Sequence, residues 1–130
     1  MSIKERNNAA QRIRRAISKA YPKTWHRVSC AASKVYVSYA NGPVHDEMAR
    51  FVAERACGVP VEVTRQYTFM AYWEAADKLG VEKNMSRAQL NYSSWMISGK
   101  PEMGSFAKKA SDHLEVLRVL GEKDLTEKTE

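Results

Sequence analysis

Several features that mark particular classes of protein are missing from this sequence of 130 residues. It has only two cysteines, Cys30 and Cys57, which leaves no framework of disulfides and no pair of CxxC motifs. No run approaches the roughly 18 consecutive apolar residues of a membrane span, and the polar N-terminus has no secretory signal pattern. We therefore expect a protein of the reducing cytoplasm without a membrane partner.

Residues that build metal, phosphate and catalytic sites are also sparse. His26, His45 and His113 lie far apart and lack the HxxxH or CxxC spacing of metal ligands. The six glycines each stand alone, so there is no glycine-rich phosphate loop. Adjacent helical residues point in different directions, so His45, Asp46 and Glu47 cannot converge on one atom. We predict a protein that is not an enzyme and has no cofactor and no metal.

Composition and length indicate one ordinary folded domain. The chain is 44% hydrophobic and 28% charged, which suits a single core without stabilising cross-links. We expect a single domain over residues 1–121 and a charged, disordered tail over 122–130. The oligomeric state stays open.

The first half changes periodicity between helix and strand. Apolar residues at helical spacing predict a helix over about 4–20, which Tyr21 and Pro22 end. A period of two predicts strands over 25–31 and 34–39, joined as an antiparallel hairpin. Gly42 and Pro43 then end the second strand, and we place Pro43 in the first turn of a helix that runs to about residue 56.

The second half is mostly helical in pattern. Residues 59–64 alternate like a short strand that Pro60 limits, and helices are expected over about 65–79, 86–97 and 105–120. The residues expected to face the core from the first and last of these helices are Phe69, Met70, Trp73, Ala76, Ala110, Leu114, Leu117 and Leu120. The whole pattern predicts an α+β fold, with a helix, a hairpin and a helix followed by a mostly helical half on the same core.

Positive charge is concentrated at one end of the chain. Residues 1–34 contain nine basic residues and the single acid Glu5, whereas residues 35–130 contain 12 basic and 14 acidic residues. At 100° per residue, four cations share the face of the first helix opposite its apolar stripe, namely Lys4, Arg12, Arg15 and Lys19. Arginine forms bidentate contacts with phosphate, so this face predicts a polyanionic partner, DNA, RNA or a nucleoprotein complex.

Other residues of the basic end extend the candidate site. We expect Arg14, Lys23, Arg27 and Lys34 to assist in binding, and Trp25 and Tyr36 of the hairpin to stack on unpaired bases. A cationic face is often only a solvated face, and the two aromatic residues have ordinary packing as their alternative role. The second functional hypothesis is a protein-binding inhibitor, whose basic face docks on an acidic protein surface without contacting nucleic acid.

Two short motifs in the first half carry a family resemblance. A helix ends in the aromatic–proline pair Tyr21-Pro22, and the second hairpin strand closes on Tyr39 followed by Gly42-Pro43. Over about residues 9–57 the chain resembles a large polyvalent protein-associated domain of phages and conjugative elements, the twenty-ninth catalogued type. It departs from that pattern at the hairpin tip, where Ala31, Ala32 and Ser33 replace a glycine-rich turn, and at Ala40-Asn41.

The resemblance implies an origin in a phage or another mobile genetic element. It further implies an accessory role in the host cytoplasm during invasion, such as an anti-defence protein that inhibits CRISPR complexes or restriction enzymes. It supplies no catalytic residues.

Overall fold

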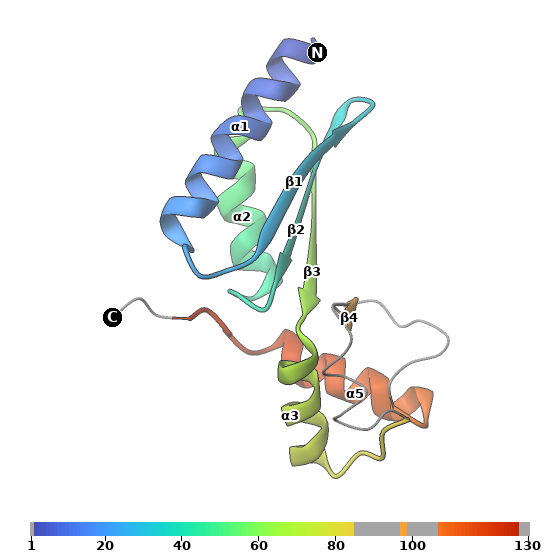
Figure 1. Cartoon of the computed structure of the whole chain (residues 1–130). Helices are drawn as coiled ribbons and strands as arrows, with labels where there is room; N and C mark the ends of the chain where they lie inside the picture. Colours follow the sequence, from blue (N-terminus) through green and yellow to red (C-terminus); the bar gives the residue numbers. More distant parts are fainter. Residues whose placement is uncertain (1, 85–96, 99–106, 128–130) are drawn as a thin grey trace. The chain divides into compact units, whose positions relative to one another are not determined.

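The computed structural model describes residues 2–84, 97–98 and 107–127, and these residues form two compact units. Unit 1 contains the described residues up to 65 together with 124–127, and unit 2 contains those from 66 to 123. The α+β class predicted from the sequence is confirmed (Figure 1). Where the sequence pattern favours a single domain over residues 1–121, the contacts divide the chain into these two units.

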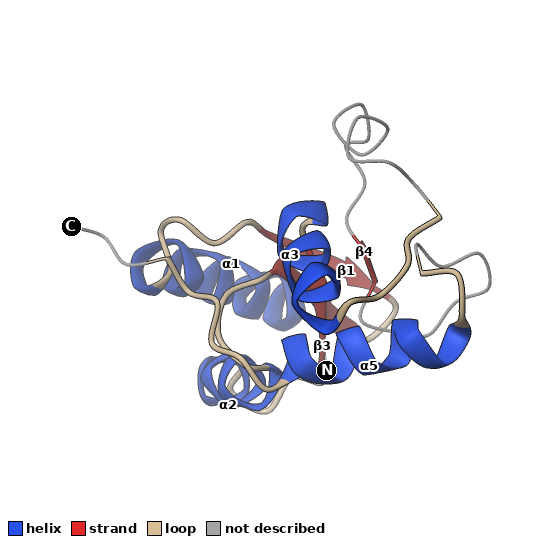
Figure 2. Ribbon diagram, turned by 90° about the horizontal axis from the view of Figure 1, so that it is seen from below, coloured by secondary structure: helices blue, strands red, loops and turns tan. Residues whose placement is uncertain are grey.

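Unit 1 consists of two helices on one side of a sheet. Its elements in chain order are α1 (Ile3–Ala20), β1 (His26–Ala31), β2 (Lys34–Ala40), α2 (His45–Arg55) and β3 (Val61–Tyr67), the last of which continues into unit 2. β2 lies between β1 and β3, and β1 and β2 are antiparallel. Figures 1 and 2 both show α1 and α2 on the same side of the strands, and the arrows of β2 and β3 point the same way in Figure 1. The predicted first helix and hairpin are confirmed.

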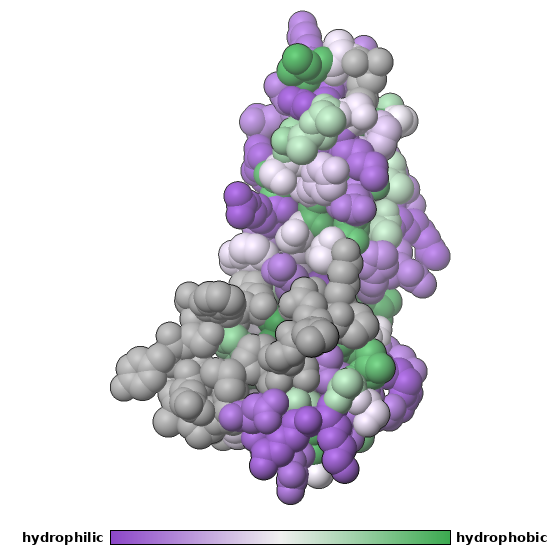
Figure 3. All heavy atoms as spheres, turned by 90° about the vertical axis from the view of Figure 1, so that its right-hand side faces the viewer, coloured by the Kyte–Doolittle hydropathy of each residue, from purple (hydrophilic) through white to green (hydrophobic). Residues whose placement is uncertain are grey.

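The opposite face of the sheet in unit 1 is polar. Its residues alternate with the buried ones along each strand, so that Arg27 lies across from Ser38, and Ser29 across from Tyr36. Figure 3 shows this side of unit 1 as hydrophilic and near-neutral residues with hydrophobic atoms in small, separate areas. No described helix of unit 1 covers it.

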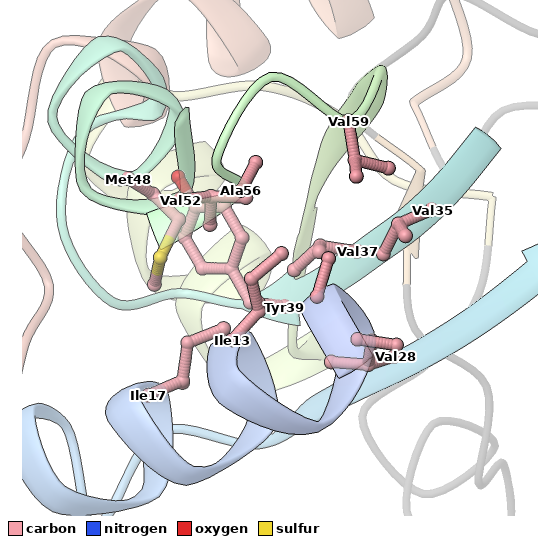
Figure 4. Packing of buried hydrophobic residues seen from close by; sticks show 12 residues of the cluster. Ile13, Ile17, Val28, Val35, Val37, Tyr39, Met48, Val52, Ala56 and Val59 are labelled. Atoms are coloured by element: carbon pink, nitrogen blue, oxygen red, sulfur yellow. The ribbon is translucent and has the colours of Figure 1, made fainter. Parts of the chain in front are cut away.

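The core of unit 1 lies between the two helices and the sheet (Figure 4). Every second residue of β2 points into it, namely Val35, Val37 and Tyr39. Ile13 and Ile17 of α1 and Met48 and Val52 of α2 complete its centre, all fully buried. The Tyr39 hydroxyl donates a hydrogen bond to the carbonyl oxygen of Pro43 at 2.9 Å, which satisfies its polar atom inside an apolar cluster.

The turn between β2 and α2 has an unusual backbone that three segments hold in place. Asn41 and Gly42 both have φ of +57°, and a Cβ atom at Gly42 would lie 3.0 Å from Thr24 Cγ2, so only glycine fits there. Arg65 of β3 donates from Nε to the Asn41 carbonyl at 2.8 Å and from Nη2 to the Gly42 carbonyl at 3.1 Å. The Leu125 amide donates to the same Gly42 carbonyl at 2.7 Å, so this part of the expected tail is bound to unit 1.

Two predicted boundaries in this region are wrong. Residues 65–67, expected to open a helix, instead extend β3 to Tyr67. Thr68 stops the strand, since it is the N-cap of the next helix and its hydroxyl accepts a hydrogen bond from the Ala71 amide at 3.3 Å. Pro43 does not lie in the first turn of α2 either, because Val44 is the N-cap and the helix begins at His45.

Unit 2 contains α3 (Phe69–Leu79), β4 (Ile97–Ser98) and α5 (Ala110–Gly121). Tyr67, at the end of β3, pairs antiparallel with Ile97. The buried residues of the two helices and the adjoining strands are Tyr67, Phe69, Tyr72, Ala75, Ala76, Ile97, His113, Val116, Leu117 and Leu120. The hydrophobic cluster around α1 and β2 consists of residues of unit 1.

Several core predictions for unit 2 are wrong in register. Met70 and Leu114, expected to face inward, are 46% and 48% exposed, and Ala110 is exposed as well. The buried stripe of α5 runs through His113, Val116, Leu117 and Leu120, and a count of apolar residues passes over His113. The inward prediction is therefore wrong for Ala110 and Leu114 and confirmed for Leu117 and Leu120, which are buried.

The remaining helix predictions differ at their described ends. α5 begins at Ala110 after the extended residue Lys109, five residues later than expected, and residues 105–106 lie outside the described part. Most of the predicted helix over 86–97 also lies outside the described residues. Its last residue, Ile97, belongs to β4.

A buried tyrosine in unit 2 predicts how its stability depends on pH. The Tyr72 hydroxyl lies 2.9 Å from Nδ1 of His113, and Tyr72 is 1% exposed. Burial, followed by the negative charge of Asp112, raises the pKa of Tyr72 to about 12. An unfolded tyrosine loses its proton near pH 10, so the stabilisation is complete below that pH and is lost as the pH rises toward 12.

We expect the free energy of unfolding of unit 2 to fall by about 1.4 kcal/mol between pH 9 and pH 11 through this group. Tyr72→Phe removes the titrating group, so the difference in unfolding free energy between wild type and variant should shrink by that amount. Urea unfolding at a series of pH values measures it. A difference that stays constant across this range would show that burial of the Tyr72 hydroxyl does not control alkaline stability.

Candidate functional site

The first helix positions most of the cations that the sequence selects. Ser2 begins it as N-cap, its hydroxyl accepting a hydrogen bond from the Glu5 amide at 3.1 Å. Its buried stripe consists of Ala9, Ala10, Ile13 and Ile17, which press it onto the sheet and α2. The opposite side of α1 is therefore held outward along the full helix.

Three arginines of α1 form hydrogen bonds that attach the helix to the rest of unit 1. Arg6 donates from Nη1 to the carbonyl oxygen of Ala32 in the hairpin turn. Arg12 donates from Nε to the Arg55 carbonyl in the last turn of α2 at 3.0 Å. Arg14 donates from Nη2 to the Val28 carbonyl of β1 at 3.2 Å.

These contacts bear on two residues of the predicted site, Arg12 and Arg14. A helix leaves its last carbonyl groups without internal partners, and a cation there also opposes the negative end of the helix dipole. Arg12 thus caps α2. Among the described strands β1 is the edge of the sheet, so Arg14 covers a backbone acceptor on that edge. Both side chains have a structural role in addition to any binding.

The capping contact predicts a measurable loss of stability. Arg12→Met keeps the aliphatic length but removes the hydrogen bond to the Arg55 carbonyl, and we expect unit 1 to lose about 1–2 kcal/mol of unfolding free energy. Arg15→Met, three residues along the same helix and exposed, is the matched control and should change stability by less than about 0.5 kcal/mol. Urea unfolding compares the two. Equal effects would contradict the capping role.

The other three cations of α1 point outward. Lys4, Arg15 and Lys19 are exposed, and within the described part of the chain their side chains form no hydrogen bond and no ion pair. At a rise of 1.5 Å per residue, Lys4 and Lys19 stand about 22 Å apart along the helix. We call these three residues the α1 surface.

The charges of the α1 surface are not balanced along the helix. No acidic residue stands three or four positions from any of the three, and Arg15 and Lys19 form a like-charge pair at i,i+4. Such a pair destabilises a helix by a few tenths of a kcal/mol. In α5, by contrast, Arg118 pairs with Glu115 three residues before it and with Glu122 four residues after it. A solvated helix of this protein thus pairs its arginine, and α1 does not.

The remaining predicted site residues lie elsewhere in unit 1. Arg27 and Tyr36 lie on the face of the sheet directed away from α1, with Lys34 at the start of β2. Trp25, 46% exposed, immediately precedes β1. Lys23 lines a small hollow formed with Asn41, Gly42 and Leu125, among others. Tyr36 is therefore not beside the α1 surface, and it shares the open face of the sheet with Arg27 instead.

Sequence reasoning based on charge passed over other residues of this region. Asn8 and Gln11 are exposed between Lys4 and Arg15 on the same side of α1, at positions that the 100° rotation already indicates.

Phe51 of α2 lies beneath the Arg55 guanidinium, 3.6 Å from ring centroid to Cζ, and makes an edge contact with Tyr21. Burial, then the nearby Glu47 carboxylate, raises the pKa of Tyr21.

His45, which stands next to Asp46 and Glu47 in the sequence, makes a contact that holds the fold together. His45 lies with Nε2 2.8 Å from the Val63 carbonyl oxygen, which ties the start of α2 to β3. Across residues 2–84, 97–98 and 107–127, no three His, Cys, Asp or Glu side chains gather as ligands for a metal ion. In the same part of the chain, no helix is both long enough and apolar enough to cross a bilayer.

No protein-family model matches the chain, and no curated protein or solved structure is significantly similar to it. The resemblance to a phage and conjugative-element domain over about residues 9–57 therefore stays a prediction. The same holds for the mobile-element origin and the anti-defence role that it implies.

Proposed function

We propose that this protein binds nucleic acid through the α1 surface, with Lys4, Arg15 and Lys19 in contact with phosphates. One observation carries the proposal: three exposed cations lie on one helix face, and none of them forms a hydrogen bond or an ion pair within the described part of the chain. A helix that keeps Arg15 next to Lys19 accepts mutual repulsion, which a bound polyanion relieves. The local excess of charge within residues 1–34 points to the same class of partner.

The arrangement also limits what the site does. Lys4, Arg15 and Lys19 carry hydrogen-bond donors and no acceptor, so we assign binding and not catalysis to the α1 surface. Phosphate contacts fix position and supply affinity that does not depend on base sequence. The proposed activity is therefore binding, whether the partner is free nucleic acid or the nucleic acid of a nucleoprotein complex.

Fluorescence anisotropy with labelled single- and double-stranded DNA and RNA, over a range of salt concentrations, tests the proposal. Three phosphate contacts give a slope of log affinity against log salt of about −2.7 on duplex DNA and about −2.1 on a single strand. Saturable binding with such a slope is the expected result. Absence of binding to all four probes at low salt would overturn the proposal and leave an acidic protein surface as the partner to seek.

A further inference from the structure

The outward side of α1 forms a straight stripe of five exposed residues. They follow one another at spacings of four, three, four and four positions, and they are Lys4, Asn8, Gln11, Arg15 and Lys19. Residues at these spacings share one face of an α-helix. None of the five side chains has a hydrogen bond or ion pair within the described part of the chain, so all donors and acceptors of the stripe face solvent.

The stripe is not uniform along its length. Lysines stand at its two ends, about 22 Å apart, and the middle holds two amides and an arginine within about 10 Å. Asparagine and glutamine pair with both N6 and N7 of adenine. About 10 Å along the helix corresponds to roughly three base pairs. The two amides of the stripe are thus suited to base edges, and its three cations are suited to phosphates.

We infer that α1 enters the major groove of double-stranded DNA, with Asn8 and Gln11 on base edges and Lys4, Arg15 and Lys19 on phosphates of the groove walls. The inference rests on the proposed function and names its substrate class. The major groove of B-DNA is about 12 Å wide and admits one α-helix, whose diameter with side chains is about 10–12 Å. The stripe of α1 faces outward, because the buried residues of the helix lie on its opposite side.

Two other nucleic acids fit the stripe less well. The major groove of an RNA duplex is too deep and narrow for side chains to read. Single strands are bound by aromatic side chains on which bases stack, and the stripe contains no aromatic residue. Tyr36 lies on the face of the sheet directed away from α1. Charge, shape and side-chain type therefore agree on duplex DNA.

The test starts from the wild-type protein and a library of duplex DNA with a randomised centre. Repeated selection should enrich a short motif, which the protein then binds at least about 30-fold more tightly than a scrambled duplex of equal length. Asn8→Ala/Gln11→Ala should reduce that preference about 10-fold or more and leave affinity for the scrambled duplex within about twofold. Ser29→Ala/Ser33→Ala, exposed polar residues of the hairpin, is the control and should keep the preference.

The outcomes separate this inference from the proposed function. Salt-dependent binding without any enriched motif, or a preference that survives Asn8→Ala/Gln11→Ala, would overturn major-groove reading by these residues and leave phosphate binding intact. Tighter binding of single strands or of duplex RNA than of the selected DNA would overturn the inference of duplex DNA. It would leave the proposed function, nucleic-acid binding, intact. Failure to bind any nucleic acid would overturn both. Thermal unfolding confirms that the alanine variant folds, since alanine at two exposed helical positions favours the helix.

Discussion

Replacement of Lys4 and Arg15 by glutamate is expected to lower the affinity for duplex DNA by at least about 50-fold at 0.1 M salt. Each phosphate contact releases nearly one counterion, so loss of two contacts should also reduce the slope of log affinity against log salt by about 2. The new carboxylates add repulsion to this loss. Anisotropy titrations of wild type and Lys4→Glu/Arg15→Glu at four or five salt concentrations measure both quantities.

The same double substitution should leave α1 as stable as in the wild type or slightly more stable. A carboxylate at position 4 lies in the first turn, where the helix dipole favours negative charge. A carboxylate at position 15 stands four residues before Lys19, which replaces a repulsive pair by an attractive one worth a few tenths of a kcal/mol. Binding and stability are thus expected to move in opposite directions. A variant that loses both would not distinguish a binding role from a structural one.

Arg27→Glu/Lys34→Glu is the matched control for this experiment. It makes the same change in net charge within unit 1, but Arg27 lies on the face of the sheet directed away from α1 and Lys34 at the start of β2. If the α1 surface binds the polyanion, the control should lose only the few-fold affinity that a general change in net charge produces. If the control loses binding and the α1 variant keeps it, the nucleic acid lies on the open face of the sheet.

Local periodicity was sufficient to predict α1, β1 and β2, because those elements show their own pattern within a few residues. The apolar stripe through Ile13 and Ile17 and the alternation of Val35, Val37 and Tyr39 are both visible without any tertiary information. The outward direction of Lys4, Arg15 and Lys19 follows from the same stripe. This part of the site was therefore available from the sequence.

The roles of Arg12 and Arg14 were not available in this way. On a helical projection Arg12 belongs with Arg15 and Lys19, and only the position of α2 shows that its guanidinium reaches a carbonyl 43 residues away in the chain. Arg14 likewise depends on which strand forms the edge of the sheet. Hydrogen bonds from long, flexible side chains to distant backbone groups leave no periodic signal. Charge patterning therefore overestimates how many cations are available to a ligand.

The boundary between β3 and α3 was missed for a related reason. Residues 65–67 have no strong local preference, and the predicted helix absorbed them because Phe69 and later residues are helical in spacing. In the structure Arg65 is held in the strand by its hydrogen bonds to the turn before α2, and Thr68 then caps the helix. Tertiary contacts of one residue and a single cap decide this boundary against the average pattern of its neighbours.

The largest expected loss of stability in unit 1 follows from that arginine. Arg65 is 5% exposed and donates to the carbonyl oxygens of Asn41 and Gly42. Both residues have positive φ, and the Gly42 carbonyl also accepts from the Leu125 amide, so Arg65 and residue 125 together hold this turn. Arg65→Met retains much of the side-chain volume but removes both donors. Because a hydrogen bond from a charged donor is worth about 1.5–3 kcal/mol, we expect a loss of about 3–5 kcal/mol.

Two further variants make the expectation specific to the guanidinium. Arg65→Lys keeps the charge but cannot reproduce the planar fork that reaches two carbonyls at once, so it should recover only part of the loss. Arg27→Met, an exposed arginine of the same sheet, should change stability by less than about 0.5 kcal/mol. Urea unfolding, with hydrogen exchange of peptides covering residues 26–40, reports on unit 1. Equal stability of Arg65→Met and Arg27→Met would mean that the turn before α2 holds its left-handed backbone without Arg65.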